Sequence, residues 1–420
     1  MQIVRLALAS LFNRRFTAGL TILSVALSVM LFVGVEKVRQ GARDSFERTI
    51  SGTDLIVGAR SSAINLVLYS VFRIGDATNN ITWDSYQRVA ERDDVAWTVP
   101  LSLGDSHRGF RVVGTTTEFF ERYQYAGDQT LAFADGVVFS DLFDAVIGAD
   151  VARELGYSVD DPIIVSHGLG DVSFTEHDDK PFRISGVLAQ TGTPVDRSVH
   201  VSLEAIEAIH LGWQSGVQTP MSRMITPDQA RQLNLRPNEI TAFLVGMKSR
   251  VRTLQAQRDI NTYRGEPLQA VIPGVALSQL WQVVGVAERA LIAVSLFVVI
   301  AGLVSVLISI LTSLNERRRE MAILRSVGAG PRDVFWLLVS EAVLLAVLGS
   351  LLGLGLLYAG LGVAAPWINE RYGVALTGLG PGLFDLYMVL GVAGAAFLLG
   401  AFPAWRAFRQ SLADGLSIKL

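Results

Sequence analysis

The sequence predicts a helical membrane protein with four transmembrane helices and a large extracytoplasmic α+β domain inserted between the first helix and the second. Half of the 420 residues are hydrophobic, and they gather into four long runs with few charges, at about 16–35, 290–314, 334–365 and 386–402. A helix of about 20 apolar residues crosses a hydrocarbon layer about 30 Å thick, whereas apolar runs of about 10–14 residues are typical of buried helices in soluble proteins. Each of the four runs comes close to the membrane-spanning length or exceeds it.

The first apolar run is expected to remain as a transmembrane helix and not to be removed as a signal peptide. The run 16–35 is longer than the apolar part of a signal peptide, and Val33-Gly34-Val35-Glu36 is a poor cleavage site. The chain contains no cysteine, so the domain of about 250 residues that follows has to depend on its own apolar core, without disulfides.

Basic residues gather in the short segments that flank the apolar runs. They are Arg5, Arg14 and Arg15 at the N terminus, Arg317, Arg318, Arg319, Arg325 and Arg332 between the second and third runs, and Arg406, Arg409 and Lys419 at the C terminus. The loop 366–385 carries Arg371 alone. Because basic residues near helix ends remain in the cytoplasm, both termini and the segment 315–333 are expected there. The region 39–285 is then expected outside the inner membrane.

These observations divide the chain into successive segments. The expected order is an amphipathic interfacial helix at 1–15, a first transmembrane helix at 16–38, a periplasmic α+β domain at 39–285, a second transmembrane helix at 286–314, a cytoplasmic segment at 315–333, a third transmembrane helix at 334–365, a short periplasmic loop at 366–385, a fourth transmembrane helix at 386–405 and a cytoplasmic tail at 406–420.

Strand-like and helix-like patterns alternate within the inserted domain, which predicts an α+β architecture. Strands are expected at 95–103, 110–114, 182–188, 199–203 and 240–247. Helices are expected at 82–91, with Thr82 as N-cap, and at 204–209 and 249–263. The pattern weakens between about 128 and 180, which leaves a separate subdomain open. The polar stretch 212–238 contains three prolines and is typical of a long loop.

The sequence lacks the common nucleotide-binding and catalytic motifs. The phosphate loop G-x-x-x-x-G-K-[ST], a strand-linked G-x-G-x-x-G, the G-x-S-x-G elbow and H-E-x-x-H are all missing. We therefore expect no catalytic residues and no hydrolysis of ATP by this chain through a phosphate loop. His167 is too far along the chain from His177-Asp178-Asp179 for a compact zinc site, so a surface loop and no metal site are expected there. Basic residues form no stripe away from the membrane flanks, which argues against nucleic acid as a partner.

Two features of the apolar runs concern the packing of the helices. Small residues recur at a spacing of four, which lets helices approach closely in lipid: Ala301, Ser305, Ser309 and Ser313 in the second helix, and Gly349 and Gly353 in the third. Glu341 is the one acid within the run 334–365. Because this run is longer than a bilayer requires, Glu341 can make an interfacial or structural pair near the cytoplasm; a coupling role inside the bundle is the alternative.

The segment between the second and third transmembrane helices has the pattern of a short charged helix with a partly apolar side. Residues 316–327 are good helix formers, Gly328-Ala-Gly330 ends the helix, and Pro331 suits the first turn of the next one. Such a helix, held between two membrane helices, can transmit movement from a cytoplasmic partner, whereas the simpler interpretation is a positively charged topogenic loop. The candidate contact residues are Glu316, Arg317, Arg318, Glu320, Leu324, Arg325, Val327 and Gly328.

The same segment resembles the signature of the MacB/FtsX-type ABC transporter permeases. The matching residues run from Glu316-Arg-Arg-Arg-Glu320 through Met-Ala-Ile-Leu-Arg-Ser-Val to Gly328, and Pro403-Ala-Trp-Arg-Ala-Phe-Arg resembles the family's C-terminal motif. The order of elements is also similar: one helix, a large periplasmic domain and then three helices. This resemblance implies a bacterial inner-membrane permease that forms a homodimer or pseudo-dimer and works with a cytoplasmic ABC ATPase.

The resemblance also implies a mechanism and a set of partners. The segment 316–328 would dock on the ATPase, which holds ATP and magnesium, and ATP-driven movement of the helices would work the periplasmic domains, a process called mechanotransmission. MacB itself carries a fused N-terminal nucleotide-binding domain, whereas this chain begins at the membrane, so the ATPase is expected as a separate subunit and no cofactor is expected on this chain. Membrane lipid and a periplasmic adaptor, lipoprotein or substrate-binding protein are further expected partners.

Three outputs of such a machine are compatible with the sequence. Export or extrusion of a substrate is the leading hypothesis. Regulation of a periplasmic cell-wall hydrolase, as in FtsX-like relatives, and extraction of lipoproteins, as in LolC/LolE-like relatives, are the alternatives.

Overall fold

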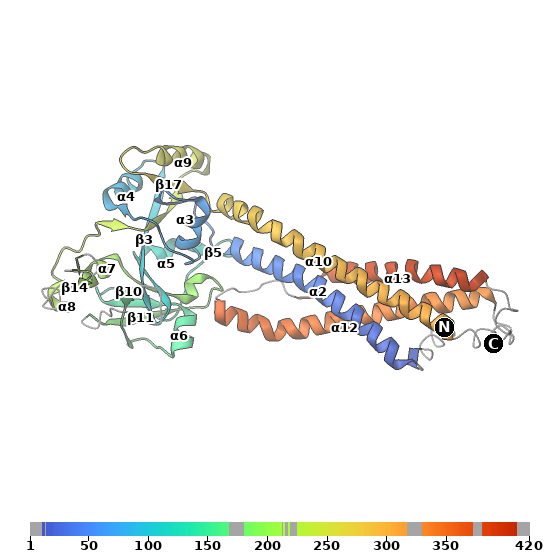
Figure 1. Cartoon of the computed structure of the whole chain (residues 1–420). Helices are drawn as coiled ribbons and strands as arrows, with labels where there is room; N and C mark the ends of the chain where they lie inside the picture. Colours follow the sequence, from blue (N-terminus) through green and yellow to red (C-terminus); the bar gives the residue numbers. More distant parts are fainter. Residues whose placement is uncertain are drawn as a thin grey trace. The chain divides into compact units, whose positions relative to one another are not determined.

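The computed structural model describes residues 11–12, 14–167, 180–211, 213–214, 217–218, 225–316, 330–372 and 380–409 (Figure 1). They fall into two compact units. The helix bundle comes from within 1–41, 285–366 and 377–420, and the α/β domain comes from within 42–284 and 367–376.

Four long helices supply the bundle: α2 (Arg15–Arg48), α10 (Pro273–Glu316), α12 (Pro331–Tyr372) and α13 (Leu383–Arg409). Each contains a stretch that is long and apolar enough to cross a membrane, so the prediction of four transmembrane helices is confirmed. α2 and α10 extend well beyond their apolar runs. The polar end of α2 stays helical with the help of ion pairs one turn apart, such as Arg43 to Glu47 at 2.8 Å.

The starts of two bundle helices follow from their sequences. α12 begins at Pro331, whose fixed φ suits the first helical position, and the carboxylate of Asp333 accepts a hydrogen bond of 2.8 Å from the amide of Gly330. Asp385 plays the same part in α13, where its carboxylate accepts a 2.8 Å bond from the amide of Gly382. In both cases an acid in the first turn satisfies an amide that the helix leaves unpaired.

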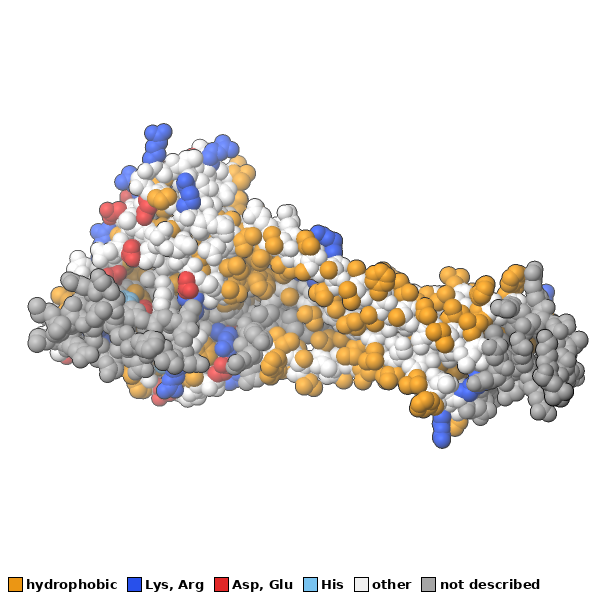
Figure 2. Space-filling view, in the orientation of Figure 1, with side chains coloured by type: hydrophobic (Ala, Val, Ile, Leu, Met, Phe, Trp, Pro, Cys, Tyr) orange, Lys and Arg blue, Asp and Glu red, His pale blue; other side chains and the backbone are white. Residues whose placement is uncertain are grey.

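The core of the bundle is built from small and β-branched apolar side chains of all four helices. They include Val25, Val29 and Val33 of α2, Val306 and Ile310 of α10, Ala342 and Ala346 of α12, and Val392 and Ala396 of α13. Larger apolar side chains face outward, such as Phe297 and Leu398, each 71% exposed. Figure 2 shows hydrophobic side chains along the helices. Helices that are apolar on both their inner and outer sides are suited to lipid.

A mixed sheet organises the α/β domain. Among the described residues it has eleven strands, and nine of them lie in the order β17 (Leu268–Val271), β1 (Leu55–Ala59), β16 (Ala242–Met247), β3 (Val95–His107), β4 (Phe110–Thr115), β12 (Ser198–Ser202), β8 (Asp144–Ile147), β11 (Phe182–Leu188) and β7 (Phe133–Gly136). The remaining two, β10 (Ser166–His167) and β9 (Pro162–Ile163), pair with β3 and β11. β12 runs parallel to β4 and β11 parallel to β8, while the other neighbours on the path are antiparallel.

Short helices and minor strands complete this domain. The helices are α3 (Ala63–Ser70), α4 (Trp83–Ala90), α5 (Glu118–Arg122), α6 (Ala149–Leu155), α7 (Leu203–Ile209), α8 (Pro227–Ala230) and α9 (Thr253–Asn261), with 3-10 turns η1 (Pro194–Arg197) and η3 (Arg250–Arg252). The minor strands are β2 (Ile81–Thr82), β5 (Gln124–Tyr125), β6 (Gln129–Thr130), β13 (Trp213–Gln214), β14 (Val217–Gln218) and β15 (Glu239–Ile240).

Most elements predicted for this domain are present. The five predicted strands correspond to β3, β4, β11, β12 and β16, and the predicted cap holds, because the hydroxyl of Thr82 accepts from the amide of Ser85 at the start of α4. Two interpretations need correction. The described part of the region 128–180 belongs to the main sheet, since β8 pairs there with both β11 and β12. Within the predicted loop 212–238, α8 forms a short helix with a capping box between Thr226 and Gln229.

Apolar cores cover both faces of the sheet, and β12 contributes to one on each face. Val199 and Val201 point into one core, whereas His200 between them faces the rings of Phe119 and Phe120 in the other, as the period of two along a strand requires. His200 is completely buried, and its ring stacks on that of Phe119 with 5.1 Å between the centroids. Burial lowers the pKa of His200 to about 3, and the nearby guanidinium of Arg73 acts in the same direction.

This burial makes stability depend on pH. Below about pH 6.5 the unfolded chain binds a proton at His200 that the folded domain does not accept, so the free energy of unfolding falls by about 1.4 kcal/mol per pH unit as pH decreases toward 3. His200→Phe removes this dependence. Denaturant unfolding of the detergent-solubilised full chain is measured between pH 7 and pH 5 by tryptophan fluorescence. The free energy of unfolding of the variant is expected to rise relative to that of the wild type as pH falls.

His210 provides a control of opposite sign. Burial disfavours its charged form, but the bond to the carboxylate of Asp105 outweighs burial and raises the pKa of His210. The folded state therefore holds this proton more tightly than the unfolded state does. The free energy of unfolding of His210→Gln should fall relative to that of the wild type as pH decreases. The same trend in both variants would contradict the assignment of a neutral buried His200.

Candidate functional site in the helix bundle

The segment predicted to contact an ATPase lies outside the described residues for the most part. Arg317, Arg318, Glu320, Leu324, Arg325, Val327 and Gly328 all belong to the stretch 317–329, and Glu316 is the last residue of α10. What the structure describes are the two helices on either side, α10 and α12. The role of this segment stays a prediction.

Two glycines let α12 approach α2 closely. A Cβ atom placed on Gly353 would lie 2.4 Å from the carbonyl oxygen of Ala26, and one on Gly349 would lie 2.6 Å from the Cβ of Val25. Neither distance is possible between real atoms, so the two positions accept only glycine at this separation of the helices. Small residues at a spacing of four serve this purpose in lipid, where helices gain little from the hydrophobic effect.

The contact of α10 with α2 depends on a residue that sequence reasoning missed. A Cβ atom on Gly302 would lie 2.6 Å from the hydroxyl oxygen of Ser28. The single proton of that hydroxyl is shared between the carbonyls of Ser24 at 2.7 Å and of Val298 at 3.0 Å. The predicted stripe is displaced by one position from this contact: Ala301 is exposed, and Ser305 and Ser309 are half-buried. Ser313 lies where side chains are not described.

A buried polar cluster joins α2, α12 and α13, and we define it as Lys37, Tyr358, Asp385 and the backbone of Gly380 and Gly382. The ammonium of Lys37 donates to the carbonyl of Gly380 at 2.7 Å and lies 3.8 Å from the carboxylate of Asp385. The other carboxylate oxygen of Asp385 accepts from the Tyr358 hydroxyl and from the Gly382 amide. Lys37 and Asp385 are only 7% and 5% exposed.

An ion-pair network next to this cluster joins α2 to α10. The guanidinium of Arg39 binds both carboxylate oxygens of Glu36 at 2.7 and 2.9 Å, and lies 3.7 Å from the carboxylate of Glu288 on α10. Together with the polar cluster, it gives α2 direct polar links to α10 and α13, and an indirect link to Tyr358 of α12 through Asp385. Buried charged groups in a membrane bundle are costly, and those that persist are paired and mark functional sites.

The remaining predicted site residues are placed as follows. Glu341 is buried on α12, with 5% of its surface exposed, and its part in coupling stays a prediction. Within the described part of the chain, no group of three or more His, Cys, Asp or Glu side chains is arranged to hold a metal ion. His167 lies in β10, whereas His177, Asp178 and Asp179 lie outside the described residues.

Two family descriptions match the sequence and together reach into all four bundle helices. They are the MacB-like periplasmic core domain, over residues 18–263, and the FtsX-like permease C-terminal, over residues 292–412. The fold and these matches define an integral membrane permease with a large α/β domain after its first helix. The chain belongs to the MacB/FtsX-like family of ABC transporter permeases.

Two curated relatives are similar over nearly the whole chain. The macrolide export ATP-binding/permease protein MacB of Nitrobacter winogradskyi is 23% identical over 98% of this chain and 60% of its own length. The pyoverdine export ATP-binding/permease protein PvdT of Pseudomonas putida is 24% identical over 94% of this chain and 56% of its own length. The chain thus spans somewhat more than half of the length of these relatives. The solved periplasmic region of MacB from Actinobacillus actinomycetemcomitans gives a TM-score of 0.33 at 9% identity, over 56% of this chain and 94% of that one.

The close contact of α2 with α12 predicts a position-specific effect on stability. Gly353→Leu is expected to lower the free energy of unfolding by about 2 kcal/mol, because the added side chain forces the two backbones apart. Gly355→Leu is the matched control, since Gly355 lies on the same helix and has no atom within 4 Å of an added Cβ. Unfolding by sodium dodecyl sulfate in mixed micelles measures both, and equal losses would refute the contact.

The polar cluster predicts that its two charges depend on each other. Lys37→Met leaves the Asp385 carboxylate buried without its cation and should cost about 3 kcal/mol in the same unfolding measurement. The double variant Lys37→Met/Asp385→Asn should lose clearly less than the sum of the two single losses. Lys248→Met, at an exposed lysine of the α/β domain, serves as the control. Additive losses would show that the two side chains do not form a pair.

Proposed function

We propose that this chain is the permease part of an ATP-driven export system in a bacterial inner membrane. ATP hydrolysis in the cytoplasm moves the helices of the bundle, and this movement drives the α/β domain on the outer side of the membrane. Membership of the permease family supports the proposal, as do the names of the two relatives, both of which specify export.

One structural observation supports transmission along the helices. α2 and α10 are continuous helices that each contribute to two cores. Val25 of α2 and Val299 of α10 are buried in the bundle core, whereas Phe46 near the end of α2 and Leu277 near the start of α10 pack into a core of the α/β domain. Backbone hydrogen bonds fix the rise of a helix at about 1.5 Å per residue, so displacement of one end along the axis is passed to the other.

Charge and sequence motifs suggest where the nucleotide, the ATPase and the other partners bind. The 420 residues contain no phosphate loop, so ATP and magnesium bind to a nucleotide-binding subunit or domain outside them. The segment Glu316–Gly328 contacts that part on the cytoplasmic side, where the arginine-rich segments also place both termini. A second permease copy completes the complex, and a periplasmic adaptor, lipoprotein or substrate-binding protein is the further partner.

Purification of the tagged full chain from solubilised membranes tests this function. Mass spectrometry of the eluate is expected to find an ATPase with a phosphate loop, unless one is part of the same polypeptide. A cell-wall hydrolase in the eluate would favour the regulatory alternative, and a lipoprotein would favour lipoprotein extraction. Absence of any nucleotide-binding partner or domain in mild detergent would overturn the proposal and leave a membrane receptor or scaffold as the better interpretation.

The coupling segment yields a prediction in the same experiment. The double variant Glu320→Ala/Arg325→Ala is expected to insert normally but to recover roughly tenfold less ATPase, which corresponds to about 1.4 kcal/mol of lost contact energy. Gly328→Pro, which changes the backbone where the segment ends, should retain binding better than it retains stimulated ATPase activity. Glu91→Ala/Arg264→Ala removes the same two charges from exposed positions of the α/β domain and is the control. Wild-type recovery and activity in the coupling variants would show that the contact lies elsewhere.

A further inference from the structure

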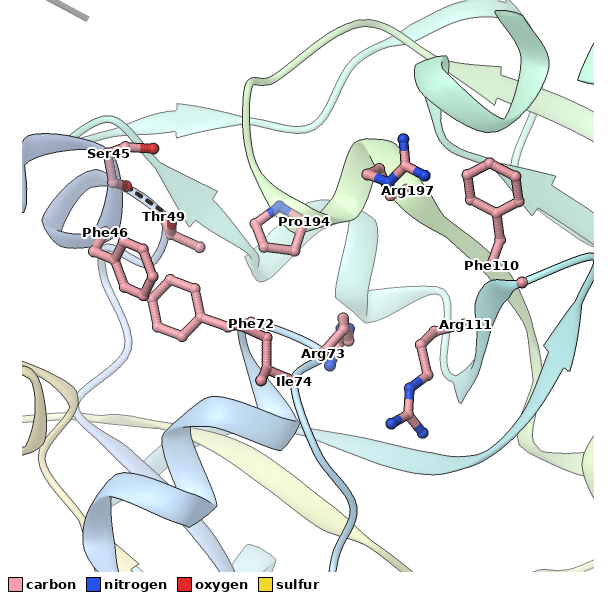
Figure 3. A pocket seen from close by; sticks show the side chains of 11 residues that line it. Ser45, Phe46, Thr49, Phe72, Arg73, Ile74, Phe110, Arg111, Pro194 and Arg197 are labelled. Carbon is pink, nitrogen blue, oxygen red and sulfur yellow. Dashed lines mark hydrogen bonds between the residues drawn. The ribbon is translucent and has the colours of Figure 1, made fainter. Parts of the chain in front are cut away.

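A cavity of about 210 Å³ lies inside the α/β domain, between the end of α2, the turn after α3, the β3–β4 hairpin and η1 (Figure 3). The eleven residues that line it include three arginines, Arg73, Arg111 and Arg197, and no acid. In Figure 3 the rings of Phe46 and Phe72 lie on one side of Arg73, and Arg111 and Arg197 lie on the other. The cavity is therefore cationic on one side and aromatic on the other.

Arg73 is the least compensated charge of the three. One terminal nitrogen donates to the carbonyl of Ser70, but Nε is buried without an acceptor, and no carboxylate among the described residues lies within ion-pair distance. Burial lowers its pKa to about 10, which still leaves it charged at neutral pH. Its backbone has φ of 60°, a left-handed conformation that side chains rarely adopt. Such strain around an uncompensated charge is typical of ligand sites.

Arg111 and Arg197 have carboxylate partners that do not line the cavity, and Arg111 also donates to the carbonyl of Gly75 at 2.6 Å. Arg111 lies 2.8 Å from the carboxylate of Asp76, whose side chain is 69% exposed, so solvent weakens this pair. Arg197 pairs with Glu154, which is not part of the lining, and its guanidinium lies 4.8 Å from the ring centre of Phe110. Stacking on Phe110 and the pair with Glu154 hold the guanidinium in place at the cavity wall.

The apolar side of the cavity is equally well ordered. The rings of Phe46 and Phe72 stack with 4.4 Å between their centroids. The volume is below the roughly 300 Å³ at which pockets for whole drug-sized ligands begin. A cavity of this size takes a head group and the first atoms attached to it, and the rest of the molecule remains outside.

We propose that this cavity binds the anionic head group, a phosphate or a carboxylate, of an amphiphile whose apolar part lies against Phe46 and Phe72. Guanidinium groups recognise these anions through paired, charge-assisted hydrogen bonds. An anionic membrane lipid and a soluble anionic aryl compound both have this chemistry. Binding depends on the cavity alone and not on the proposed export function.

Titration calorimetry on the purified full chain in a neutral maltoside detergent tests the proposal. The probes are dihexanoyl phosphatidylglycerol, naphthyl phosphate and inorganic phosphate. At least one of the first two is expected to bind about tenfold or more tightly than inorganic phosphate does, because only they fill the aromatic side. Binding of the lipid alone would identify a lipid as the source, and binding of the aryl phosphate alone would identify a soluble compound.

Variants separate the cavity from binding elsewhere. Arg73→Gln is expected to weaken binding about tenfold or more, since one charge-assisted contact is lost, and Arg73→Lys should retain part of it. Arg197→Gln provides a second test if Arg73→Gln does not fold, as judged by circular dichroism and gel filtration. Arg264→Gln, at an exposed arginine that does not line the cavity, should bind as the wild type does. Equal binding in all these variants, or no preference over inorganic phosphate, would overturn the proposal.

Discussion

The bundle depends on how closely α2 approaches its neighbours. Lipid chains are as apolar as the helix surfaces, so helices in a membrane are held by close packing and by a few hydrogen bonds. α2 has both. Ala26 meets α12 at Gly353 with no side chain between the backbones, Ser28 meets α10 at Gly302, and Lys37 lies against Asp385 of α13. A rotation of α2 about its axis would break the packing contacts and the polar contacts together, so the three interfaces fix a single orientation.

The transmembrane part of the fold could be predicted because the length of an apolar run is a local property. The continuation of α2 to Arg48 could not, because hydropathy does not register a polar helix. Strands such as β11 were predictable from their own composition. The place of β8 in the sheet was not, because it depends on pairing with β12 and β11, which come much later in the chain, and β11 pairs with it in parallel.

The candidate site could be predicted only in part. The spacing of Gly349 and Gly353 indicated a close contact. When a helix is apolar on every side, its sequence does not show which face meets a neighbouring helix. The sequence therefore suggested Ala301, whereas the structure places Gly302 in the contact. Lys37 and Asp385 were not among the residues singled out from the sequence. Nothing in the sequence pairs two residues so far apart, although a charge of each sign directly beside an apolar run was a signal for such a pair. The coupling segment was found from its resemblance to a family signature, a signal that needs no contact geometry.

Both the proposed transmission of movement and the proposed ligand site involve α2. Along this helix, the glycine contact near Ala26 comes first, and Lys37 and Arg39 follow. Phe46, which lines the proposed anion-binding cavity, comes last. A bound amphiphile would touch the same helix that is proposed to carry movement. Coupling between two events on one element is reciprocal, so if displacement of α2 changes the affinity of the cavity, the ligand biases that displacement by the same free energy. The size of this effect depends on how differently Ser45 and Phe46 contact the ligand in the two positions of the helix, because a ligand that binds both positions equally shifts neither.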